Sequence, residues 1–84
     1  MKLSIYSLKR ILFQGRADLL NCKTPMGEIT ILDNHQTLIS LLSKGTLRVI
    51  EVLENREKKE RFFSIKSGFL EVRKNNEVRC LVEE

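Results

Sequence analysis

The side chains that could act as nucleophiles or metal ligands are few and far apart. His35 is the only histidine, and the two cysteines, Cys22 and Cys80, are 58 positions apart. A histidine beside a cysteine could activate the thiol for covalent catalysis, and clustered Cys and His could bind zinc. No local motif supports a Cys–His pair, and neither cysteine has a second ligand nearby. We therefore expect no catalytic residue, no metal site and no cofactor, with His35 in a turn and two buried, reduced thiols.

The glycines exclude two common ways of holding a nucleotide. A P-loop or a dinucleotide-binding fingerprint needs several glycines within a few residues. The four glycines of this chain are scattered along it, at Gly15, Gly27, Gly45 and Gly68.

The most charged stretch, ENREKKER at 54–61, invites a nucleic-acid interpretation. Its acidic and basic residues interleave, however, and nearly cancel the field that phosphate binding requires. The net charge of the chain is only +4. We interpret 54–61 as a solvated hairpin tip. Base stacking would also require exposed aromatic rings, and only Tyr6 and Phe62 fall opposite the apolar phase of their strands; core packing is the default for the other three.

Apolar residues recur mostly at a spacing of two, which is typical of strands with one buried face. Turn signals separate the runs at intervals near ten residues. The pattern predicts one all-β domain over 1–84, an antiparallel β-sandwich or barrel of about eight to ten short strands. Segment 36–43 is ambiguous, because Leu38, Leu41 and Leu42 have helical spacing while Ile39 suits a strand. Between the sheets we expect four core side chains from the last third of the chain: Phe63, Ile65, Leu70 and Val72.

No apolar run is long enough to cross a bilayer as a helix; the run Ile11-Leu12-Phe13 compares with the roughly 20 residues required. The first residues resemble neither a signal peptide nor a transit segment. We expect a protein made and kept in the cytosol of a bacterium.

Two long segments carry a family resemblance: TPMGEITILDNHQTLISLLSKGTLRV at 24–49 and FFSIKSGFLEVRKNNEVRCLVEE at 62–84. Their order of motifs is a Gly-Glu before an apolar run, a tight turn ending in histidine, a Leu-rich stretch, a Lys-x-Gly turn and Gly-Phe-Leu-Glu-Val before a last hairpin. Together with the opening KLSIYSLKRILFQGRADLL, they resemble the epsilon subunit of F-type ATP synthases, in its N-terminal β-sandwich domain. The resemblance covers nearly the whole chain.

Three departures from the family pattern affect local geometry. The turn before the histidine reads Asp33-Asn34 in place of Pro-Gly or Pro-Asn, and Thr37 stands where a proline is common. Asn34 can still adopt a left-handed conformation. Ser67 replaces the first glycine of a pair, which implies that only Gly68 needs unusual backbone freedom.

The resemblance implies a non-catalytic rotor part that couples the gamma subunit to the membrane c-type ring, peripheral to the cytoplasmic face of the bacterial inner membrane, with no nucleic acid bound. By carry-over, the polar loops of the ring would face Met26, Gly27 and Glu28, and gamma would face Ser7, His35, Thr37 and Ser40. Without the resemblance, Glu28 reads as an ordinary solvated turn carboxylate.

Family members commonly continue into a C-terminal α-helical hairpin, whereas the sequence here stops at Glu84. We expect this chain to assemble and support coupling without acting as the hydrolysis-inhibiting switch that the hairpin provides. The alternative function is a free-standing small β-barrel that binds single-stranded nucleic acid or a peptide.

Overall fold

The computed structural model describes residues 1–84 as eight strands and no helix. The number of strands and the all-β class agree with the prediction from the apolar alternation. The structure contains no helix that could span a membrane. The strands are β1 (Lys2–Ser7), β2 (Ile11–Thr24), β3 (Gly27–Leu32), β4 (Leu38–Leu42), β5 (Gly45–Val52), β6 (Lys58–Ile65), β7 (Ser67–Arg73) and β8 (Glu77–Glu83).

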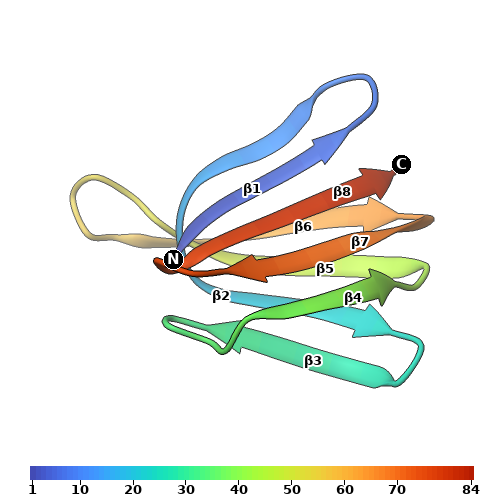
Figure 1. Ribbon diagram of the computed structural model, residues 1–84. Coiled ribbons are helices and arrows are strands. Elements are labelled where there is room, and N and C mark those ends of the chain that lie inside the picture. The colour runs from blue at the N-terminus through green and yellow to red at the C-terminus, as the bar shows by residue number, and fades with distance from the viewer.

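The strands form two layers that share the long strand β2. One layer, sheet A, has the order β4-β7-β8-β1-β2, and the other, sheet B, contains β3, β2, β5 and β6 (Figure 1). The first part of β2 pairs with β1, and its part from Ala17 onward pairs with β5 and β3. The register shifts between Ala17 and Leu19, where β2 passes from one sheet to the other. A bulge at such a place bends the strand and lets it belong to both layers.

One strand pair departs from the expected antiparallel arrangement. β1 and β8 run parallel, with Leu3 opposite Val78 and Ile5 opposite Cys80. The remaining pairs are antiparallel. A hairpin turn can join only antiparallel neighbours, so the turn signals of the sequence could not reveal a pair formed by strands far apart in the chain. The sheet is therefore mixed, although mostly antiparallel.

The core lies between the two sheets and confirms most of the predicted strand phases. Ile65, Leu70 and Val72 are buried, but Phe63 is only half-buried and packs against the edge of the core. Phe63 thus keeps the inward strand phase predicted for it, but it is less buried than the other three. The buried apolar residues are Met1, Leu3, Ile5, Phe13, Ala17, Leu20, Cys22, Ile31, Leu42, Leu47, Val49, Ile65, Leu70, Val72, Val78, Cys80 and Val82.

The ambiguous segment 36–43 contains a strand, β4, at the edge of sheet A. Leu42 is buried and Leu38 is half-buried, whereas Leu41 is 54% exposed. The helical spacing of the three leucines thus has no structural counterpart. Pairing with β7 along its whole length holds β4 in the strand conformation.

The reasons why glycine is needed at positions 27 and 68 differ from the sequence-based expectation. Gly68 does not have a positive φ; a Cβ there would lie 2.6 Å from the carbonyl oxygen of Leu81, so the constraint is close approach of the neighbouring strand. Gly27 has φ 121°, in open space, and is the glycine that needs conformational freedom. Asn34 adopts φ 60°, which confirms the left-handed turn expected for it.

Candidate docking surfaces

The three residues predicted to face a membrane ring lie at the tight turn between β2 and β3. Thr24 organises this turn: its hydroxyl donates to the carbonyl of Gly27 at 2.8 Å and accepts from the N–H of Met26 at 3.1 Å. Met26 is 95% exposed at the tip, and Glu28 is exposed beside it, across from Lys23 on β2. The turn therefore presents a bare thioether and a carboxylate on a rigid, hydrogen-bonded support.

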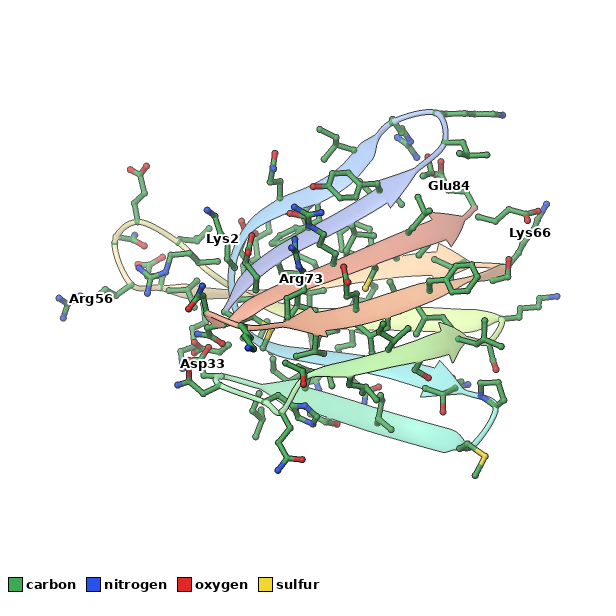
Figure 2. All side chains as sticks on the ribbon, in the orientation of Figure 1. Lys2, Asp33, Arg56, Lys66, Arg73 and Glu84 are labelled. Atoms are coloured by element: carbon green, nitrogen blue, oxygen red, sulfur yellow. The ribbon has the colours of Figure 1, made fainter.

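This turn lies at one end of the sandwich, and the β5–β6 hairpin lies at the other (Figure 1). Lys66 and Glu84 mark the same end as the turn, while Asp33 and Arg56 mark the opposite end (Figure 2). A partner that binds Met26–Glu28 thus approaches the end of the molecule and leaves both sheet faces open.

The four residues predicted to face a gamma subunit do not form one patch. His35 and Thr37 are exposed in the connection between β3 and β4, and Ser40 lies within β4. Ser7 ends β1 near the opposite end of the sandwich, as the strand directions in Figure 1 show. His35, Thr37 and Ser40 therefore lie along the edge of sheet A that β4 forms, whereas Ser7 lies away from them.

The hydrogen bonds of these residues are mostly local. The Ser7 hydroxyl accepts the N–H groups of Lys9 and Arg10, each at 3.2 Å, and so shapes the β1–β2 loop. The His35 ring is within 2.8 Å of the carbonyl of Gln36 through Nδ1. Ser40 donates to the carbonyl of Leu41 at 3.0 Å, and it shares the inward phase of Leu42. None of these side chains has a nucleophile–base geometry.

The connection that carries His35 is held in place by an amide clip. The backbone N–H of Asn34 donates to the side-chain oxygen of Asn76 at 2.8 Å, and the amide of Asn76 donates to Asp33 Oδ1 at 3.3 Å. The ammonium group of Met1 also contacts Asp33. The hydrogen bond from the Met1 ammonium group is the largest cause that lowers the pKa of the Asp33 carboxyl, and the hydrogen bond from Asn76 is the next. The clip ties the β3–β4 and β7–β8 connections together.

A row of apolar side chains crosses the outer face of sheet A and was not predicted. Each member lies opposite the next in the strand register, on five neighbouring strands from β4 to β2. Four are between 48% and 58% exposed, and Tyr6 is half-buried. At about 4.8 Å between strands, the row is about 19 Å long. Its members are Leu41, Phe69, Leu81, Tyr6 and Ile11.

The alternation of inward and outward side chains along each strand could have predicted part of this row from the sequence. Leu70 and Val72 point into the core, so Phe69 must point outward, and the same holds for Leu81 between Cys80 and Val82. The expectation that Phe69 packs in the core is therefore wrong. The outward phase predicted for Tyr6 and Phe62 is confirmed, since Phe62 is 59% exposed.

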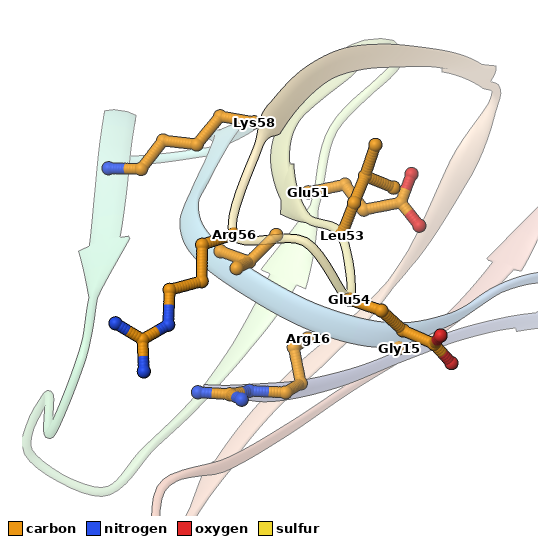
Figure 3. Close-up of a pocket in the computed structure, with 8 residues that line it drawn as sticks. Gly15, Arg16, Glu51, Leu53, Glu54, Arg56 and Lys58 are labelled. Carbon is orange, nitrogen blue, oxygen red and sulfur yellow. The ribbon is translucent and has the colours of Figure 1, made fainter.

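The largest hollow of the surface lies at the β5–β6 hairpin and does not have the character of a phosphate site (Figure 3). It measures about 820 Å³ and is lined by three basic residues, Arg16, Arg56 and Lys58, and by two acidic ones, Glu51 and Glu54. Lys58 is paired with Asp18 at 2.7 Å. No aromatic ring lines the hollow. Residues 54–57 form the solvated turn that was predicted, whereas 58–61, which the prediction placed in the hairpin tip, belong to strand β6.

The sequence matches the family described as ATP synthase, Delta/Epsilon chain, beta-sandwich domain, over residues 1–84. The chain belongs to this family. The epsilon sandwich is a non-catalytic part of ATP synthase.

Curated relatives named ATP synthase epsilon chain show the same relationship. The protein of Nitrosococcus oceani is 36% identical over 72 residues, which are 86% of this chain and 49% of the relative. That of Brevibacillus brevis is 28% identical over 83 residues, 99% of this chain and 59% of the relative. The chain thus spans about half the length of the relatives it matches.

Solved structures support the fold of the epsilon sandwich. A chain of the Euglena gracilis mitochondrial ATP synthase superposes with a TM-score of 0.82 at 24% identity, covering 100% of this chain and 51% of that one. A chain from the structure of the central stalk and c-ring of the Tetrahymena thermophila mitochondrial ATP synthase superposes with a TM-score of 0.80 at 17% identity, covering 100% of this chain and 63% of that one.

Proposed function

We propose that this sandwich is a rotor module of an F-type ATP synthase that couples the gamma subunit to the membrane c-type ring during ion-driven ATP synthesis. Family membership supports the central-stalk role. The observation that carries the proposal further is the apolar row Leu41–Phe69–Leu81–Tyr6–Ile11, because a rotor part needs an adhesive surface rather than a reactive group. Exposed apolar side chains that adjoin one another across a sheet face are typical of protein interfaces.

Two surfaces on different sides of the molecule suit two partners at once. The apolar row covers a sheet face, and the Met26–Glu28 turn occupies one end. We assign the row, with the neighbouring edge that carries His35, Thr37 and Ser40, to gamma, and the turn to the polar loops of the ring. Ser7 contributes by shaping the β1–β2 loop beside the row. The module is then peripheral to the cytoplasmic face of the bacterial inner membrane.

The alternative, a free-standing barrel that binds single-stranded nucleic acid, finds less support in the surface. The basic side chains of the hairpin are largely paired, as in Arg48 with Glu60 at 2.5 Å and Arg61 with Glu51 at 3.1 Å. Arg61 also lies over the rings of Phe13 and Phe63, at 5.7 and 5.6 Å from their centroids. Phe13 is buried and Phe63 is half-buried, so neither ring presents an open face on which a base could stack.

Co-purification tests the proposal. A tagged copy of the chain, isolated from detergent-solubilised membranes of its own cell, should recover gamma and the ring subunit in fixed ratio. Recovery of the chain without gamma, together with salt-sensitive binding to a single-stranded oligonucleotide, would overturn the rotor assignment in favour of the alternative.

A further inference from the structure

A groove of about 370 Å³ interrupts the outer face of sheet A alongside the apolar row. Its walls are mostly apolar, but two charged side chains, one acidic and one basic, lie among them. The residues that matter for its chemistry are Tyr6, Ile39, Phe69, Leu81, Glu71 and Arg79.

Arg79 is the basic side chain of this groove. It lies on β8 directly across from Glu71 on β7 and beside Ser4 on β1. The Glu71 carboxylate is nevertheless 3.9 Å from Nε of Arg73, and Arg79 makes no ion pair. An exposed guanidinium therefore lies in a mostly apolar groove, with the Glu71 carboxylate on the strand across from it but with no ion pair of its own.

We infer that Arg79 is a specificity-determining residue of the gamma-binding surface, and that gamma inserts an apolar side chain into the groove with a carboxylate next to it. The inference rests on the proposed function. Covering the groove removes water from the guanidinium, while the Glu71 carboxylate is shared with Arg73, and a desolvated charge without a full partner is strongly unfavourable. A partner with a carboxylate at this point is accepted, and an equally apolar partner without one is rejected. The planar guanidinium is suited to bidentate binding of that carboxylate.

The same groove disfavours a phosphate ligand. It offers a single cation, which matches the one negative charge of a carboxylate but not the two charges of a phosphate dianion. Ile39, which is 76% exposed at the rim, requires an apolar neighbour instead. A protein segment that combines an apolar side chain and a carboxylate meets both conditions.

Binding of the purified gamma subunit to the whole chain, measured by titration calorimetry, tests this assignment. Arg79→Gln removes the charge without placing two glutamates across from each other, and should weaken the affinity about tenfold or more. Lys59→Gln is the matched control, because Lys59 is an exposed, unpaired cation on sheet B. It should change the affinity less than about threefold. Unchanged thermal unfolding of both variants would exclude a folding effect.

A double-mutant cycle identifies the partner group. Surface carboxylates of gamma are changed to amides one at a time, and one of them should weaken binding of the wild-type chain but have no further effect on Arg79→Gln. Equal affinities of Arg79→Gln, Lys59→Gln and the wild type would overturn the role of Arg79 while leaving the rotor assignment intact. Failure of the wild-type chain to bind gamma would overturn both.

Discussion

Gly68 of β7 lies so close to β8 that a Cβ at this position would be 2.6 Å from the carbonyl oxygen of Leu81. Such a Cβ would also be 3.0 Å from Cγ1 and 3.1 Å from Cα of Val82. Two of these three atoms belong to the backbone, which cannot rotate away as a side chain could. The β7–β8 pair therefore depends on the missing side chain, and not on a special backbone angle.

Gly68→Ala should lower the free energy of unfolding by about 1–3 kcal/mol, because β7 and β8 must separate to admit the methyl group. Urea denaturation measures the loss. Gly15→Ala is the control, since its Cβ would meet only the Phe13 ring, at an ordinary 3.6 Å. A similar change in both variants would contradict the steric explanation.

The burial of two core candidates predicts an order of mutational effects. Leu70 is fully buried, so Leu70→Ala should lower the free energy of unfolding by about 2–5 kcal/mol. Phe63 is half-buried and makes an edge-to-face contact with Phe13 at 6.0 Å, so Phe63→Ala should cost about 1–3 kcal/mol. Chemical denaturation of both variants decides the order; a larger loss for Phe63→Ala would show that β6 packs more deeply than the structure has it.

Glu28→Lys should weaken docking to the ring by at most about 3 kcal/mol without unfolding the domain, because Glu28 is exposed and would act as one member of an interfacial charge pair. Binding of the variant to purified ring measures the effect. Glu57→Lys, at the opposite end of the sandwich, makes the same charge change and should leave docking unchanged. Equal affinities for the wild type and Glu28→Lys would remove Glu28 from the docking surface.

The two core cysteines should be unreactive in the native state. Burial raises the pKa of the Cys22 thiol to about 11, and the negative charge of Glu28 is a second, smaller cause. Burial also raises the pKa of the Cys80 thiol, and the charge of Cys22 is a second, smaller cause. Since the thiolate is the reactive form, a disulfide reagent at pH 8 should modify the folded chain far more slowly than the urea-unfolded chain. Equal rates would contradict the burial of both side chains.

The same pKa shift makes stability fall at alkaline pH. An unfolded thiol ionises near pH 8.5, whereas the native Cys22 keeps its proton to about pH 11. The stability that the protonated Cys22 thiol contributes to the native state is therefore fully present below about pH 8.5 and is lost as the pH rises toward 11. Urea denaturation at several pH values between 8 and 11 measures it. The variant Cys22→Ala should show a smaller decline over this range, and an identical decline would contradict the assignment to Cys22.

Local sequence patterns determined most of the strands of this protein. Apolar alternation identifies a strand and its buried face from a few neighbouring residues, and turn residues such as Asn34 or the pair Asn75-Asn76, both with positive φ, mark where hairpins reverse. Ile65, Leu70 and Val72 were placed correctly for this reason. The family motifs likewise could be recognised without coordinates.

Contacts between distant segments were decided only by the tertiary structure. The parallel pairing of β1 with β8 joins the two ends of the chain, and no turn between them encodes it. The extent to which Phe63 is buried depends on where the edge of sheet B lies relative to Phe13 on β2.

The candidate docking surface was also predictable only in part from the sequence. That Phe69 and Leu81 point outward follows from strand phase and could have been read from the sequence. That they align with Leu41, Tyr6 and Ile11 in one row depends on the register of four strand pairs, which is set by packing of the opposite, buried face. A shift of any one strand by a single residue would turn its side chains to the other face, so the row exists only because the core fixes every register at once.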